Sequence, residues 1–316
     1  TFSEGGGEYN VARAISRCFG HKSGVVTSLV ENEIGRLVCH LVEGSGVDVS
    51  RILWREFDGI GKEVRNPLYF AERGFGCRAP KAVMDRGHSG PSQMTVDDVD
   101  WDVIFASGDV TWFHTGGIFA GLSESSAEVA EAAMRAARAA GVHVSYDLNF
   151  RASLWQSRGG SVSAAALNRK LVIHADTLFG VGPLMQTTAP SDIPEEVEIL
   201  MKETATAFPQ LQSIVVGRRS VRSASSHDYA ASSWHKGEIS HVDGHQSIEV
   251  LDRIGSGDAF AAGYISSMIE GADQAHALQI GCAAAALTMS TPGDAMMVSR
   301  QEVESLANPK SQGENR

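Results

Sequence analysis

The chain has 316 residues, and 43% of them are hydrophobic, which is ample for a large core. Its 27 basic and 38 acidic residues give a net charge of −11, which argues against nucleic acid and anionic membranes as partners. An acidic substrate would need a local cluster of Arg or Lys. The four cysteines form no Cys-x-x-C pair, so neither a zinc site nor a disulfide framework is indicated, and a cytoplasmic location is expected. No apolar run in the sequence is long enough to span a bilayer.

The sequence starts with a glycine-rich loop, Gly5-Gly6-Gly7. Apolar residues follow at helical spacing between residues 11 and 19, so the loop is expected to open a helix. Glycine lets a backbone approach a ligand closely, and the loop therefore predicts a ligand contact near Gly6 and Asn10. A strand over 24–30 and a helix over 34–43 come next and begin a parallel sheet.

The helical period is lost between about residues 47 and 89, where short β-prone pieces lie among Gly, Arg and Glu. We interpret this stretch as a small antiparallel flap inserted into a single α/β domain that spans residues 1–316. Tyr69 and Arg86 are its favoured ligand residues, because an aromatic ring and a guanidinium suit a polar acid. Exposed apolar residues on such a flap predict a homodimer that forms through it.

A strand over 110–117, an alanine-rich helix over 124–140 and a strand over 142–149 form a predicted βαβ unit. Ligands of open α/β sheets lie beyond the carboxyl ends of the strands. This rule places five residues at one edge of the sheet: Gly116, Gly117, Asp147, Asn149 and Arg151.

Alternation continues to the end of the chain. The further expected elements are helices over 162–174, 193–207, 272–290 and 300–307, strands over 176–180 and 213–217, and a meander of short strands over 221–250. Gly281 is expected to allow close packing of its helix. His114 lies in an apolar strand, where histidine is more often a hydrogen-bonded core residue than a catalytic one. No metal-ligating residue can be named, because the histidines at 235, 241 and 245 have no flanking Cys or acidic pattern.

The most informative stretch is Asp252 to Gly263, which reads Asp-Arg-Ile-Gly-Ser-Gly-Asp-Ala-Phe-Ala-Ala-Gly. The loop Gly255-Ser256-Gly257 leads into a helix, whose unpaired N–H groups and partial positive charge make an anion site. Asp258 would repel a resting phosphate there, but it could accept the proton of an incoming hydroxyl. A glycine turn with Asp258 as the helix N-cap is the structural alternative.

This stretch resembles the second signature of the ribokinase-like (PfkB) carbohydrate kinases, and Gly5 to Ala12 resembles their first glycine motif, Gly-Gly-x-x-x-Asn-x-Ala. Within that family, further pieces are similar to 2-keto-3-deoxygluconate kinases: residues 112–118, 147–151, 219–225 and 292–294. The resemblance implies an α/β fold, a ribokinase-like three-layer α/β/α sandwich with a small β lid.

The resemblance also implies ATP- and Mg²⁺-dependent phosphorylation of a sugar-acid hydroxyl, with 2-keto-3-deoxygluconate and its 6-phosphate as the expected substrate and product. Asp258 would be the general base, next to an anion hole. The anion hole would consist of Gly255, Ser256 and Gly257. The substrate pocket would be lined by Gly6, Asn10, Tyr69, Arg86 and Arg151. The nucleotide would lie beside Arg219 and Gly257.

Two departures from the family pattern lead to alternatives. A central strand is expected ahead of the first glycine motif, and a sheet without it would leave backbone groups of its neighbours unpaired. The family's Asn-x-x-Glu group, which helps to organise magnesium, is replaced by Val181-Gly182-Pro183-Leu184. The alternatives are a neutral-sugar kinase of the fructose or ribose type and a catalytically weak homologue that binds sugar or nucleotide.

Overall fold

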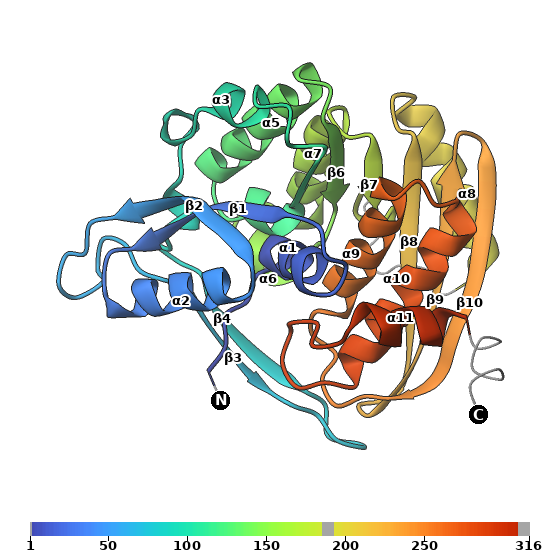
Figure 1. Ribbon diagram of the computed structural model, residues 1–316. Coiled ribbons are helices and arrows are strands. Elements are labelled where there is room, and N and C mark those ends of the chain that lie inside the picture. Colours follow the sequence, from blue (N-terminus) through green and yellow to red (C-terminus); the bar gives the residue numbers. More distant parts are fainter. Residues whose placement is uncertain (1, 185–192, 309–316) are drawn as a thin grey trace.

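A six-stranded sheet forms the centre of the molecule in the computed structural model, which describes residues 2–184 and 193–308 (Figure 1). Its strand order is β10-β9-β8-β7-β6-β5. The strands are β5 (Trp112–Gly116), β6 (His143–Asp147), β7 (Thr177–Phe179), β8 (Ser213–Ser223), β9 (Ser226–His235) and β10 (Glu238–Glu249). Strands β5 to β8 are parallel, and β9 and β10 complete the sheet in antiparallel fashion. The parallel strands β5, β6 and β7 have five, five and three residues, and helices cover both faces of the parallel part of the sheet.

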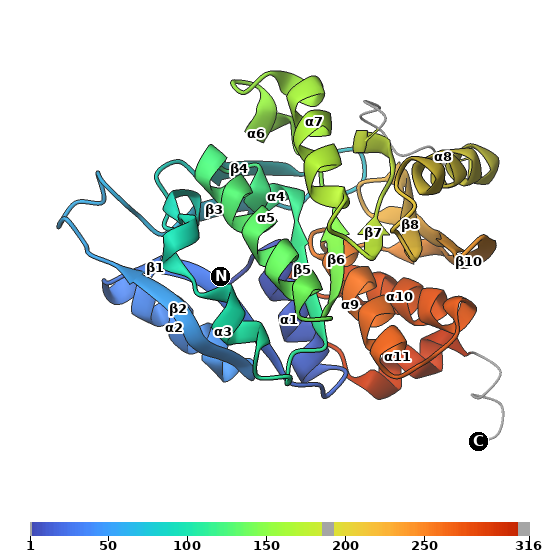
Figure 2. The ribbon, with the colours of Figure 1, turned by 90° about the horizontal axis from the view of Figure 1, so that it is seen from above.

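Helices cover the two faces of this sheet and complete a three-layer α/β/α sandwich (Figure 2). One face carries α5 (Glu124–Ala139), α7 (Gly160–Val172) and α8 (Pro194–Ala207). The other face carries α1 (Gly7–Arg17), α9 (Ser256–Ile269), α10 (Gln274–Met289) and α11 (Arg300–Ala307). Shorter helices at the edges are α3 (Trp101–Phe105), α4 (Gly117–Ala120) and α6 (Ala152–Trp155). The expected fold class is confirmed.

Helices α9 and α10 pack unusually closely because glycines meet at their contact. A Cβ atom added to Gly263 would lie 3.0 Å from the Cα of Gly281, and one added to Gly281 would lie 2.8 Å from the ring of Phe260. The expectation that Gly281 packs closely is confirmed. This contact matters for the functional site, because α9 carries Asp258 in its first turn.

Two expectations about strands were wrong in part. Residues 47–55 are not part of an antiparallel flap, because β2 (Val47–Arg55) pairs in parallel with β1 (Ser23–Val30), and α2 (Glu33–Gly44) connects the two. Residues 221–250 form the expected antiparallel meander, from the end of β8 through β9 and β10, but its strands are long and not short. The antiparallel flap is confined to β3 (Leu68–Glu72) and β4 (Lys81–Asp85), which project away from the body of the molecule (Figure 1).

Strands β1 and β5 each have one unpaired edge in the described part of the chain, since β1 pairs with β2 and β5 with β6. A cleft of about 2510 Å³ is lined by Val26 of β1 and Phe113 of β5, and it extends to the carboxyl edge of the sheet. Within the described residues, the six-stranded sheet and the β1–β2 pair are therefore separate sheets. Within residues 2–184 and 193–308, no helix has the length and apolar character needed to cross a membrane.

Replacing Gly281 with Ala is expected to destabilise the protein by about 1–3 kcal/mol, because the new methyl group would overlap the ring and backbone of Phe260. Urea unfolding measures this change. Gly44→Ala is the matched control: no atom lies within 4 Å of its added Cβ, so the helix should be unchanged or stabilised by up to about 1 kcal/mol. Equal stability of Gly281→Ala and the parent chain would contradict the close packing.

Candidate active site

The loop that precedes α9 has the geometry of an anion site. Gly255 occupies the N-cap position with a φ of 77°, in the left-handed region that favours glycine. A side chain there would also overlap the backbone of Asp294. The Ser256 hydroxyl donates a hydrogen bond to the carbonyl of Arg253 at 3.0 Å, which fixes the loop below the helix. The N–H groups of the first turn have no carbonyl partner within the helix, so they are available to an anion.

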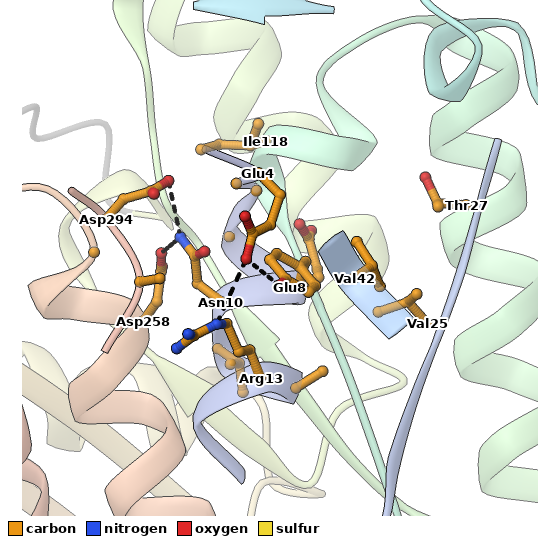
Figure 3. Close-up of a pocket in the computed structure, with 18 of the residues that line it drawn as sticks. Glu4, Glu8, Asn10, Arg13, Val25, Thr27, Val42, Ile118, Asp258 and Asp294 are labelled. Atoms are coloured by element: carbon orange, nitrogen blue, oxygen red, sulfur yellow. Dashed lines mark hydrogen bonds and ion pairs between the residues drawn. The ribbon is translucent and has the colours of Figure 1, made fainter. Parts of the chain in front are cut away.

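Asp258 lies in the first turn of α9 and is not its N-cap, so the capping alternative is wrong. The Asn10 side-chain amide donates to Asp258 Oδ2 at 2.8 Å and to Asp294 Oδ2 at 3.3 Å (Figure 3). Burial raises the pKa of Asp258 to about 7, against the opposing effect of the Asn10 hydrogen bond. A carboxylate with a pKa near neutrality can accept a proton from a hydroxyl and still be ionised at physiological pH.

Two more acidic side chains lie close to Asp258. Asp147 ends β6, and burial raises its pKa to about 6. Glu8 lies in the first turn of α1, and burial raises its pKa as well. Its Oε1 atom is shielded from solvent and has no hydrogen-bond partner. The sequence analysis missed Glu8, although its place inside the first glycine motif, two residues before Asn10, was a usable signal.

Arg86 and Arg151 bring two guanidinium groups to the same region. Burial lowers the pKa of Arg86, and the neighbouring charge of Arg151 lowers it further, while Glu8 opposes this effect. Neither guanidinium forms an ion pair within 4.0 Å among the described residues. Two adjacent positive charges without a bound carboxylate form a site that an anionic ligand would stabilise.

Tyr69 of β3 and Arg219 of β8 also line the cleft. Burial raises the pKa of Tyr69 to about 12, and the charges of Asp294 and Asp252 contribute to this shift. Tyr69 is therefore close to Asp252, which precedes α9, and to Asp294, which follows α10. Arg219 of β8 donates to the carbonyl of Arg253 at 3.3 Å, which joins the central sheet to the loop before α9.

All the candidate residues line the same cleft, and their individual roles stay predictions. The lining includes Gly6, Asn10, Tyr69, Arg86, Arg151, Arg219, Gly255, Ser256, Gly257 and Asp258. His114 is hydrogen-bonded, as expected, but it is half-buried and lines the cleft instead of lying in the core. Its Nδ1 atom lies 2.8 Å from the Ser145 hydroxyl, and burial lowers its pKa to about 4.

The segment after β7 does not fit a protein-held magnesium ion. Val181 and Leu184 are buried in the hydrophobic core, and residues 182–184 form a short 3-10 helix. The Leu184 carbonyl accepts hydrogen bonds from the guanidinium of Arg169. In the described part of the chain, no group of three or more His, Cys, Asp or Glu side chains is placed to hold a metal ion.

Known proteins share both this sequence pattern and this fold. A 2-dehydro-3-deoxygalactonokinase of Haloferax volcanii is 27% identical over 303 residues, which are 96% of this chain and 87% of the relative. The crystal structure of a 2-dehydro-3-deoxygluconokinase of Thermotoga maritima matches with a TM-score of 0.86 and 27% identity, over 96% of this chain and 89% of that one.

A fructokinase of Xylella fastidiosa, solved with bound ATP, shares the fold with a TM-score of 0.74 at 22% identity, over 97% of this chain and 91% of that one. The family model of the pfkB family carbohydrate kinases matches residues 1–300. This match includes both glycine motifs and every residue placed in the cleft above. The chain therefore belongs to the pfkB family of carbohydrate kinases.

Proposed function

We propose that this kinase transfers the γ-phosphoryl group of ATP to a hydroxyl of a sugar acid, with 2-keto-3-deoxygluconate as the first candidate substrate. The observation that carries the proposal is the pair of guanidinium groups, Arg86 and Arg151, in the same cleft as Asp258. A substrate carboxylate would relieve their mutual repulsion, whereas a neutral sugar would not. The names of the relatives from Haloferax volcanii and Thermotoga maritima, both keto-deoxy sugar-acid kinases, support this substrate class.

The proposed reaction needs little covalent chemistry from the protein. Asp258 accepts the proton of the substrate hydroxyl while that oxygen bonds to the γ-phosphorus, and the bond to ADP breaks with its electron pair leaving on ADP. The N–H groups of residues 255–257 stabilise the charge of the transferring group. Asn10 holds Asp258 by its hydrogen bond of 2.8 Å. The nucleotide would lie beside Arg219 and Gly257. No atom lies within 4 Å of a Cβ added to Gly257, so this residue leaves room for a ligand.

ATP is the proposed phosphate donor, and the ATP-bound fructokinase of the same fold supports this choice. Residues 181–184 offer no ligand to a metal, so we propose that Mg²⁺ arrives coordinated by the phosphates of ATP. Because residues 181–184 lack the Asn-x-x-Glu group of the family, a catalytically weak homologue is the second candidate. A neutral-sugar kinase is the third candidate, and the unpaired guanidinium groups weigh against it.

We propose further that β3 and β4 act as a lid on a single domain and pair with a second copy of the chain. Phe70 and Val83 lie opposite each other in this hairpin and are 66% and 65% exposed. An isolated two-stranded hairpin is marginally stable in water, so burial against a partner would stabilise it. Four free thiols, at residues 18, 39, 77 and 282, support a reducing, cytoplasmic location.

Asp258→Asn is expected to lower kcat by about 10²–10⁴-fold, because an amide cannot accept the hydroxyl proton. Affinity for ATP, measured by calorimetry, should be unchanged. Asp97→Asn is the matched control, since Asp97 is exposed and outside the cleft. Unchanged turnover in Asp258→Asn would exclude Asp258 as the base.

Arg151→Ala is expected to lower kcat/KM for sugar acids by about 10- to 100-fold, because a charge-assisted hydrogen bond to the substrate carboxylate is lost. Activity on fructose or ribose, where detectable, should not change. An ADP-release assay over a panel of both substrate classes measures the difference. Arg78→Ala is the control in the lid, since Arg78 does not line the cleft. An equal loss on both classes would contradict the carboxylate-binding role.

Val83→Lys is expected to convert a dimer into a monomer, because it places a further charge directly opposite the exposed ring of Phe70. Light scattering at micromolar concentration measures the mass. Val162→Lys is the control, because Val162 is 61% exposed on α7, away from the lid. A parent chain that is itself monomeric would refute the dimer.

A further inference from the structure

Asp294 lies where the two glycine motifs meet. It follows α10, and only 7% of its surface is exposed. A side chain on Gly5 would overlap the Asp294 carboxylate, and one on Gly255 would overlap the Asp294 backbone. The first and second motifs thus each use a glycine to make room for the same residue.

The orientation of the Asn10 amide depends on Asp294. Asn10 Nδ2 has two hydrogens, and it donates to Asp258 Oδ2 at 2.8 Å and to Asp294 Oδ2 at 3.3 Å. If the amide turned over, its oxygen would face both carboxylates and be repelled by them. Asn10 Oδ1 is buried and has no hydrogen-bond partner, so it does not hold the amide in place. The two carboxylates together fix the direction of the donor (Figure 3).

The charged groups that face Asp258 come from several elements. Asp147 lies at the end of β6, Glu8 lies on α1, and Asp294 follows α10; each of these carboxylates adds to the effect of burial and raises the pKa of Asp258. On β9, Tyr229 also interacts with Asp258, but burial raises the pKa of its hydroxyl, so it is uncharged at neutral pH. Asn10 acts in the opposite direction through its hydrogen bond. Of the three carboxylates, Asp294 is the one that shares the Asn10 amide with Asp258.

We propose that Asp294 is a positioning residue for phosphoryl transfer: through the amide of Asn10, it fixes the orientation of Asp258 toward the substrate hydroxyl. The inference rests on the proposed function and adds a residue to it. Asp294 itself is not proposed to contact a reacting atom. It acts through Asn10, which lies near the opposite end of the sequence.

The test is the pH profile of Asp294→Asn. We expect kcat to fall by about 10- to 100-fold, because Asn10 loses a charged acceptor and its amide is free to turn over. The acidic limb of the kcat/KM profile should also move down by about 0.5–1 pH unit, because removing a negative charge near Asp258 makes its proton easier to lose. A residue that only supports the fold would lower activity or thermal stability without moving the limb. The control is again Asp97→Asn, which should move neither.

A double-mutant cycle tests whether Asp294 acts through Asn10. If it does, Asn10→Ala combined with Asp294→Asn should lose no more kcat than Asn10→Ala alone. Losses that multiply would overturn the proposal. Asp294→Ser is the second variant: it is smaller and uncharged, and it should shift the pH limb in the same direction if the first variant does not fold.

A measurement without turnover separates this inference from the proposed function. ¹³C NMR titration of the Asp258 carboxyl should show a lower pKa in Asp294→Asn than in the parent chain. If the parent chain phosphorylates no sugar or sugar acid, the proposed function fails. The parent chain could be active while Asp294→Asn has the same kcat, the same acidic limb of the pH profile and the same Asp258 pKa by NMR. In that case the proposed function stands and the role of Asp294 is refuted.

Discussion

The site depends on one uncharged amide that lies between a half-buried carboxylate and a buried one. Asn10 on α1 donates to Asp258 on α9 at 2.8 Å and to Asp294 after α10 at 3.3 Å. These contacts join residues that are 248 and 284 positions apart in the sequence. The geometry of Asp258 therefore depends on how closely α1, α9 and α10 pack, and the glycines between α9 and α10 make that close packing possible. The stability of the helix layer and the orientation of Asp258 thus depend on the same packing.

Charge is distributed unevenly in the cleft. Carboxyl groups gather around Asp258, and desolvation raises their pKa values, so their ionisation is costly in the free protein. The guanidinium groups of Arg86 and Arg151 are placed together a short way along the cleft, and burial lowers the pKa of Arg86. A sugar acid could interact with both groups of residues, because its carboxylate could bind the two arginines and its hydroxyl could donate a proton to Asp258. The acidic chain as a whole thus contains a local pair of guanidinium groups, which we propose to bind the substrate carboxylate.

Local patterns in the sequence were enough to locate the two glycine motifs and the alternation of strands and helices, because periodicity and glycine turns reflect short-range geometry. The three-layer fold and the expected role of Asp258 followed from the resemblance to the PfkB kinases. They were not enough for features that depend on distant partners. Residues 47–55 look β-prone whether they pair in parallel or antiparallel fashion, and only the contact with β1 decides between the two. The effect of Glu8 and Asp294 on Asp258 arises from tertiary contacts and could not be predicted, although the position of Glu8 in the first glycine motif marked it as a candidate site residue.

The central claim is that a sugar acid is the phosphoryl acceptor, and it is tested most directly by ADP release from ATP with 2-keto-3-deoxygluconate, compared with fructose and ribose. We expect turnover with the sugar acid and a kcat/KM at least about 10-fold above that for either neutral sugar, as one charge-assisted contact would give. A preference for a neutral sugar, or no ADP release with any sugar acid tested, would contradict it.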